Sequence, residues 1–236
     1  MSLTPIFIDC KNLRFERQNL NNKIVFNAIN NNDFKSFNNN INQQELKRLL
    51  EDTNLTLEEL FKECNNNHLI NKLVSRQISI NSSRQGCKDE EIQINICSIF
   101  AKNYGIIIDK LDINAFRPTK DGKIISKKEL KNLNISLDNC LKSFDAKISG
   151  KINGWIFAKI VFGTGGHQDN VFEEADNLCN WINNYRNNYN EIYVFLIDTD
   201  LNLKFEILKN KYLINKNIII TNHYDFQNFI KDNYKF

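Results

Sequence analysis

Asp145 and Lys159 are two residues whose types and spacing suit hydrolysis of a phosphodiester bond. They lie in a stretch, residues 143–170, that predicts two short strands, a glycine loop and the start of a helix. Asp145 is in the first strand and Lys159 is near the middle of the second, so antiparallel pairing would bring the two side chains together. The carboxylate could then hold a divalent metal ion, and the lysine could orient or deprotonate the attacking water.

Two strands must hold this pair, and the sequence places them near residues 142–149 and 153–162. Asn153-Gly154 lies at or just after the hairpin connection between them. The second strand is apolar apart from Lys159. Because burying an unpaired ammonium group is costly, Lys159 requires either a carboxylate partner or a place at the sheet edge from which its amine reaches water.

This segment resembles the PD-(D/E)xK nuclease fold, and within it the type II restriction endonucleases. In that family an Asp opens one strand and a (D/E)-x-K triplet lies on the next. Asp145 matches the first acid, and Ala158 and Lys159 match the end of the triplet. The sequence GTGGHQDN at residues 163–170 is similar to the glycine-rich G-x-x-G-x-Q-D segment of the members that cut GAATTC. The resemblance covers roughly residues 76–200.

The resemblance implies a Mg²⁺-dependent endonuclease that cuts both strands of double-stranded DNA at a short palindromic site. It implies a homodimer, since a two-fold symmetric site calls for a two-fold symmetric protein. A cognate DNA methyltransferase is the implied partner in a restriction-modification system. Asp145 would be a metal ligand, Lys159 the water-orienting residue and the backbone carbonyl of Ala158 a further ligand.

The chain departs from the family pattern at the acidic position of the triplet, which is occupied by Phe157. A phenylalanine cannot bind metal, so a carboxylate from elsewhere must replace it or the site is weakened. Glu90 and Glu91 are the candidates, because they lie on the first turns of the predicted helix before the sheet, and that helix often lends a glutamate to the metal in this fold. The alternative is that these acids only favour the helix N-terminus through its dipole.

A second register takes Asp145-Ala146-Lys147 as the triplet, with Asp109 or Asp112 as the upstream acid. Asp145 and Lys147 differ by two positions and would share one face of their strand. This register ranks second because it leaves Lys159 on the adjacent strand without a role.

The glycine loop and the helix that follows are the predicted DNA-reading surface. Backbone N–H groups at a helix N-terminus favour a phosphate, and Asn or Gln side chains can pair with adenine in the major groove. Capping of the helix by Asp169 or Asn170 is the structural alternative. The polar turn SSRQG supplies a second contact suited to guanine or phosphate. The candidate DNA-binding residues are Arg84, Gln85, Gly166, His167, Gln168, Asp169 and Asn170.

Two other functions use the same features. A nucleotide- or methyl-donor-binding α/β enzyme could place its ligand on the GTGG loop, with Asp198 at the end of the next strand binding a ribose. Against it, the loop lacks the third spaced glycine of GxGxxG and lies late in the chain, after two hairpin strands. The other alternative is a catalytically inactive DNA-binding module of the nuclease fold, its metal site lost with the missing acid.

Composition is that of an ordinary globular protein. The 236 residues are 42% hydrophobic and 25% charged, with a formal net charge of +3, which tolerates an acidic partner without requiring one. The six cysteines include no CxxC pair, and no apolar run reaches the length of about 20 residues that spans a membrane. A cytoplasmic protein with reduced thiols is expected.

The element order predicts an α/β protein with a restriction-endonuclease-like mixed sheet flanked by helices. Residues 1–75 would form a mainly helical N-terminal subdomain and residues 76–236 the nuclease core, although the two could be one integrated domain. Beside the two central strands, strands are expected at 3–8, 106–108, 191–197 and 217–221. Helices are expected at 43–51, 56–64, 88–104, 169–187 and 224–233, with a capping box at Thr56 and Glu59.

Overall fold

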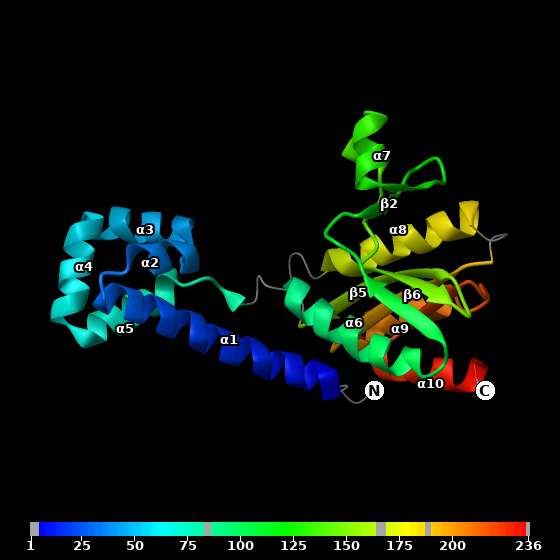
Figure 1. The fold of residues 1–236 in the computed structure, drawn as a ribbon, viewed down its shortest axis with the longest axis horizontal. Coiled ribbons are helices and arrows are strands. Elements are labelled where there is room, and N and C mark those ends of the chain that lie inside the picture. Colours follow the sequence, from blue (N-terminus) through cyan, green and yellow to red (C-terminus); the bar gives the residue numbers. More distant parts are fainter. Residues whose placement is uncertain (1–4, 83–85, 164–168, 187–189, 235–236) are drawn as a thin grey trace. The chain divides into compact units, whose positions relative to one another are not determined.

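The computed structural model describes residues 5–82, 86–163, 169–186 and 190–234. The chain forms two compact units, Asp9–Gly86 and Cys87–Phe236 with Met1–Ile8. The first unit is helical, and the second is built on a sheet (Figure 1). The boundary predicted after residue 75 lies inside helix α5 (His68–Ile78), whereas the compact units divide after Gly86.

The first part of the chain forms five helices: α1 (Pro5–Asn30), α2 (Phe34–Asn40), α3 (Gln43–Thr53), α4 (Leu57–Asn66) and α5. The helices predicted over 43–51 and 56–64 are confirmed. The predicted capping box is also present, because Thr56 N–H donates to Glu59 Oε2 (2.8 Å) and Glu59 N–H donates to Thr56 Oγ1 (3.3 Å). Val25, Ile29, Phe37, Phe61 and Ile78 are among the buried residues that form the core of this unit.

Asparagine side chains and backbones make the turns between these helices. Asn32 and Asn54 have φ values of 50° and 53°, a left-handed conformation that asparagine tolerates better than most residues. Asn42 and Asn67 cap α3 and α5 through their side-chain oxygens. The Asn-rich stretches therefore act as helix boundaries.

The strand predicted over residues 3–8 is wrong where the structure describes it, because Pro5–Ile8 begin helix α1. Proline is favoured at the first helical position, where its missing N–H has no intrahelical partner. A short apolar run such as PIFI has no periodicity that separates a strand from the start of a helix.

The second unit contains a mixed five-stranded sheet in the order β1-β4-β5-β6-β7. Its strands are β1 (Ile106–Lys110), β4 (Ala146–Gly150), β5 (Gly154–Val161), β6 (Ile192–Thr199) and β7 (Ile218–Thr221). β4 is antiparallel to both β1 and β5, and β5, β6 and β7 are parallel. The α/β class with a mixed sheet and the antiparallel pairing of the two central strands are thereby confirmed.

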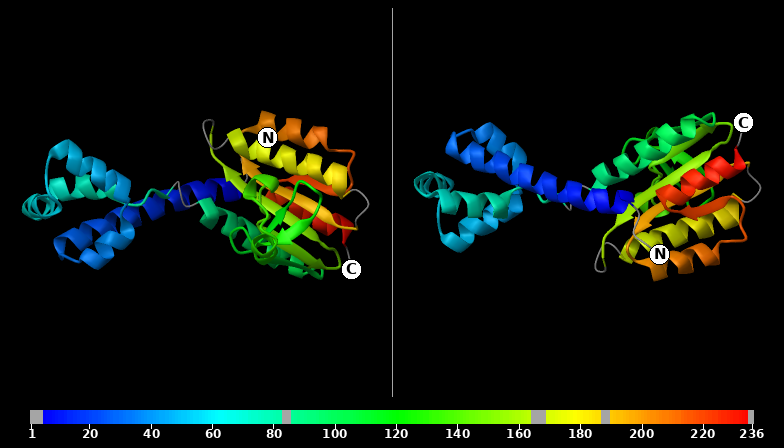
Figure 2. Two further views of the ribbon diagram at one scale, coloured as in Figure 1. Left: turned by 90° about the horizontal axis from the view of Figure 1, so that it is seen from above. Right: turned by 90° about the horizontal axis from the view of Figure 1, so that it is seen from below.

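Helices cover both faces of this sheet, as the two views in Figure 2 show. On one face, α6 (Gly86–Lys102) and α10 (His223–Asn233) pack through Ile94 and Phe226 onto a layer that includes Ala158. On the other face, α8 (Asp169–Tyr185) and α9 (Asn202–Lys211) pack onto a layer that includes Phe157. Successive residues of β5 therefore face opposite cores.

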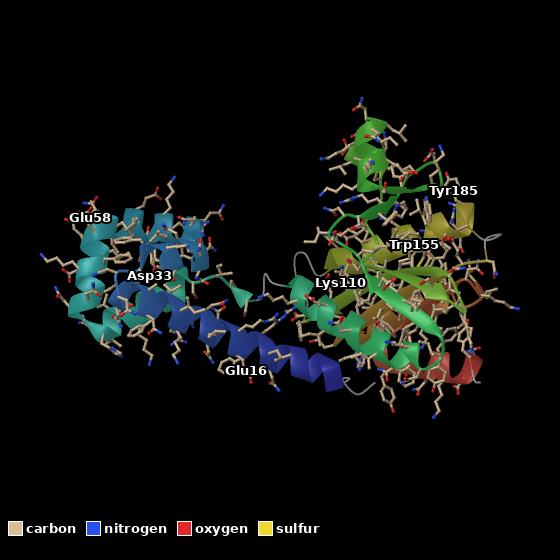
Figure 3. All side chains as sticks on the ribbon, viewed as in Figure 1. Glu16, Asp33, Glu58, Lys110, Trp155 and Tyr185 are labelled. Atoms are coloured by element: carbon tan, nitrogen blue, oxygen red, sulfur yellow. The ribbon has the colours of Figure 1, made fainter. Side chains whose placement is uncertain are left out.

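Several small elements between β1 and β4 were not predicted. They are β2 (Phe116–Pro118), β3 (Ile124–Ser126), α7 (Lys127–Asn132) and a 3₁₀ turn (Leu137–Asn139). The turn predicted at Asp121-Gly122 is present between β2 and β3, where Gly122 N–H donates to Thr119 O (3.0 Å). A Cβ at Gly122 would lie 2.7 Å from the ring of Tyr185, which Figure 3 labels, so only glycine fits there.

Within the described ranges, no helix combines the length and the apolar character needed to cross a membrane.

Candidate active site

Three charged side chains meet at one end of β4 and β5: Glu90 from α6, Lys159 from β5, and Asp145, which lies just before β4 and not within it as predicted. Lys159 Nζ lies 2.7 Å from Glu90 Oε1 and 3.2 Å from Asp145 Oδ2. All three are largely buried, with side-chain exposures of 13% for Lys159, 21% for Glu90 and 22% for Asp145. One ammonium group therefore lies against two carboxylates, and we call Glu90, Asp145 and Lys159 the charged triad.

Asp145 is positioned by the start of β4. Its N–H donates to Ile156 O on β5 (2.8 Å), and its own carbonyl accepts from Leu111 N–H (2.9 Å). β4 begins at the next residue, and Asp145 Oδ2 accepts a hydrogen bond from Ala158 N–H (2.9 Å). The carboxylate thus takes the place of a strand neighbour for Ala158, which ties Asp145 to the same segment that carries Lys159.

Lys159 is positioned by β5, on which it lies two residues after Phe157. Phe157 is fully buried in the core beneath α8, and the Lys159 amine lies 5.0 Å from the centre of the Phe157 ring, a cation–π distance. Phe157, which the resemblance aligns with the acid of the PD-(D/E)xK triplet, is therefore a core residue in this chain. It contributes no oxygen to the site.

Glu90, and not Glu91, reaches the charged triad. Glu91 Oε2 instead pairs with Lys110 of β1 (2.9 Å), and both of these side chains are more exposed, at 49% and 38% (Lys110 is labelled in Figure 3). Asp89 is the acid in the first turn of α6. Consecutive helical residues are about 100° apart around the axis, so Glu90 and Glu91 point to different sides of α6.

Burial and charge act in opposite directions on this triad. Burial raises the pKa of Glu90, and the attraction of Lys159 offsets only part of that effect. Burial by itself would lower the pKa of Lys159, but Asp145 and Glu90 together raise it above its ordinary value. Lys159 is therefore protonated at neutral pH.

The alternative register based on Lys147 has no comparable cluster. Lys147 is exposed, and its amine lies 5.6 Å from the ring of Trp155. Asp109 is its register partner on β1, but among the described residues no ion pair joins Asp109 or Asp112 to Lys147. Lys159, and not Lys147, is the lysine that contacts the carboxylate of Asp145.

A buried polar network behind the triad was not predicted from the sequence as a unit. Asp198, which is fully buried at the end of β6, accepts from Gln93 Nε2 (2.6 Å) and from His223 N–H (3.3 Å), and its Oδ1 lies 3.1 Å from His223 Nδ1. Gln93 Nε2 also lies 3.5 Å from Lys159 O. Since Gln93 is one turn after Glu90 on α6, this network fixes the helix that presents Glu90. It also removes Asp198 from the surface where a ribose would bind.

Most of the predicted DNA contacts lie outside the described residues. These are Arg84, Gln85, Gly166, His167 and Gln168, and the side chain of Asp169 is outside them too. Asp169 begins α8, as predicted, and Asn170 is exposed in its first turn. Before the loop, Gly163 N–H donates to Asp200 Oδ1 (2.7 Å). These contacts stay predictions.

The donors in the charged triad suit a hard divalent cation. Their oxygens come from Glu90 and Asp145, whose carboxylates both approach the ammonium group of Lys159. Mg²⁺ commonly takes one or two protein carboxylates and completes its shell with water. The described residues contain no group of three or more His, Cys, Asp or Glu side chains placed to hold a metal ion. Two carboxylates are fewer than the three or four protein ligands that zinc takes.

A comparison of the chain with protein-family models, with curated proteins and with solved structures found no match.

Proposed function

We propose that this protein is a Mg²⁺-dependent endonuclease of the PD-(D/E)xK type that cuts double-stranded DNA, as type II restriction enzymes do. The observation that carries the proposal is the charged triad, in which Lys159 lies between Asp145 and Glu90. The triad has the residue types of the family's metal and water site. Its second carboxylate comes from helix α6, 69 positions before Lys159, because the triplet position is Phe157.

Asp145 and Glu90 would hold the metal ion, and the backbone carbonyl of Ala158 would be a further ligand. The N–H of Ala158 donates to Asp145 Oδ2. When bound, such an ion neutralises charge on the scissile phosphate and activates a water molecule. Asp145 is oriented for this role by the strand contacts on both of its sides. Glu90 is oriented by the polar network around Gln93 and Asp198.

Lys159 acts as a hydrogen-bond donor. Its pKa lies above the ordinary value because two carboxylates face it, so it keeps its proton at neutral pH. A protonated lysine can orient a water molecule through its donors and can stabilise negative charge on a phosphate oxygen. Burial strengthens both effects because less water screens the ammonium group.

The rest of the proposal follows from a symmetric target. A palindromic site with two cuts is best served by a homodimer that places one charged triad on each strand. A cognate DNA methyltransferase would protect the host sequence, and both proteins would work in the cytoplasm. In the nucleotide-binding alternative, Asp198 would bind a ribose. Against that alternative, Asp198 is fully buried and hydrogen-bonded to Gln93 and His223.

The proposal is tested by digesting mixed-sequence duplex DNA with the purified full chain. In Mg²⁺ we expect discrete fragments that share one terminal sequence, and with EDTA we expect none. Sequencing of the fragment ends identifies the site. DNA that binds with the steep salt dependence of phosphate contacts but is never cut would favour a binding-only module and overturn the enzymatic proposal.

Cleavage is expected to fall on acidification at a higher pH than an ordinary glutamate would require. Metal binding needs the ionised form of Glu90, and burial raises the pKa of this group. At Mg²⁺ concentrations too low to saturate the site, the acid limb of the pH–rate profile should therefore lie above the usual glutamate range, and a Glu90→Asp variant should shift it. Because the folded-state pKa is raised, the contribution of Glu90 to the free energy of unfolding is present at low pH and is lost as pH rises through that pKa. An acid limb within the ordinary glutamate range would contradict Glu90 as the titrating ligand.

A further inference from the structure

The helical unit contains a groove of about 420 Å³ between helices α1 and α5. Both helices face it with residues at successive turns. Phe15, Lys23 and Phe26 line it from α1, and His68, Lys72 and Arg76 line it from α5. All of these residues belong to the compact unit Asp9–Gly86, so the groove is a property of that unit alone.

The groove is cationic. Lys23, Lys72 and Arg76 are exposed, and in the described part of the chain none of them is engaged in an ion pair. The described residues that line the groove include no Asp or Glu. Glu16, which follows Phe15 in the sequence and is labelled in Figure 3, does not line it. Lys72 and Arg76 are one turn apart on α5, where like charges disfavour the helix slightly. A bound anion would relieve that repulsion.

The same groove offers aromatic surface. Phe15 is 69% exposed, so its ring is open to a ligand. Phe26 contacts the ring of His68 edge to face, with 5.0 Å between ring centres. Aromatic rings beside lysine and arginine side chains are the combination on which proteins stack unpaired bases while holding the phosphates.

The size of the groove selects the form of the ligand. A volume of about 420 Å³ is within the range of small-molecule sites, the size class to which a single nucleotide belongs. We propose that the groove between α1 and α5 binds an unpaired nucleotide, with the base against Phe15 and the phosphate held by Lys23 and Lys72. The ligand is a single-stranded stretch of nucleic acid. This inference goes beyond the proposed cleavage and does not depend on the charged triad.

The test measures fluorescence anisotropy of a short labelled oligothymidylate with the full-length protein in EDTA, where no cleavage takes place. Phe15→Ala is expected to weaken binding about tenfold, within the range for loss of one stacked base. A Lys23→Gln/Lys72→Gln variant is expected to weaken it similarly and to reduce the dependence of log Kd on log salt by about 0.7 for each lost phosphate contact.

Matched controls separate the groove from the general surface. Leu20→Ala removes an exposed apolar side chain from α1 outside the groove, and Lys62→Gln removes an exposed lysine from α4. Both should bind oligothymidylate as the unaltered protein does. Circular dichroism melting curves of all variants establish that they fold, as expected for replacement of exposed residues.

Competitors then identify the ligand. Displacement by free thymidine monophosphate at equal nucleotide concentration would indicate that the groove binds a free nucleotide. Failure to displace would support single-stranded nucleic acid as the ligand. Unchanged affinity in the groove variants overturns the inference. So does displacement by polyglutamate together with an unaffected Phe15→Ala variant, which would indicate an acidic polypeptide partner. An Asp145→Ala protein should bind oligothymidylate normally. Binding in the groove and DNA cleavage can therefore fail independently of each other.

Discussion

Lys159→Ala and Asp145→Ala are each expected to reduce DNA cleavage in Mg²⁺ by about 10²–10⁴-fold, the range typical of a positioned proton-transfer or orienting group. DNA binding should remain nearly unchanged, since most affinity for duplex DNA comes from phosphate contacts spread over the surface. The physical reason is that Lys159 and Asp145 form one unit with Glu90, joined by contacts of 2.7 and 3.2 Å. The measurement pairs single-turnover cleavage rates with duplex affinity in Ca²⁺.

Lys147→Ala is the matched control for Lys159→Ala. Lys147 is the other lysine within β4 and β5, and it is exposed beside Trp155. It should cleave like the unaltered protein. Asp145→Asn, which keeps the side-chain shape, guards against a loss of activity through misfolding. Substantial cleavage by Lys159→Ala, or an equal loss in Lys147→Ala, would show that the site has been assigned to the wrong lysine.

Glu90→Gln is expected to raise the Mg²⁺ concentration needed for half-maximal cleavage by more than the about 10–100-fold typical of losing an outer-shell partner. Glu91→Gln, one residue later on the same helix, should keep the normal metal requirement. The reason for the contrast is geometric, because Glu90 contacts Lys159 in the charged triad whereas Glu91 pairs with Lys110 of β1. Both substitutions remove one negative charge and keep the side-chain size.

The comparison is made by titrating Mg²⁺ at constant ionic strength for both variants. Equal, normal metal dependence would reject Glu90 as the replacement for the missing triplet acid. A larger effect in Glu91→Gln would instead assign the second carboxylate to Glu91. Thermal melting without metal is a second measurement that compares the two variants. Glu90→Gln removes a group whose burial opposes its ionisation, whereas Glu91→Gln removes only a surface ion pair.

Local patterns in the sequence were sufficient for most of the sheet unit. The alternation around Lys159 and the hairpin signal at Asn153-Gly154 predicted β4 and β5, and the antiparallel pair Ala146 and Ile156 confirms their pairing. Caps and apolar periodicity likewise predicted α6 and α8 within a few residues of their bounds, as they did α4 in the helical unit. These features depend on neighbours in the chain, so they can be inferred without knowing the fold.

Helix α9 shows where local pattern is insufficient. Leu203, Phe205 and Ile207 alternate with polar residues, which is typical of a strand, yet the segment is helical. Phe205 and Leu208 are buried against the sheet, whereas Leu203 and Ile207 are 77% and 60% exposed. The choice between the two periods was made by packing of Phe205 and Leu208, a contact with strands distant in the chain.

Sequence patterns were enough to predict the α/β class and the antiparallel pair of strands beside Asp145 and Lys159. The family resemblance left either a replacement carboxylate or a weakened site where Phe157 stands. Which of the two glutamates lies against Lys159 depends on the tertiary structure. Glu90 and Glu91 are equivalent as sequence, and the rotation of α6 against β5 separates them. That rotation is set by burial of Ile94 and Cys97 and by the hydrogen bond from Gln93 to Asp198, which joins residues 105 positions apart. Contacts of that range arise only when the chain has folded, because no local signal links the residues that make them.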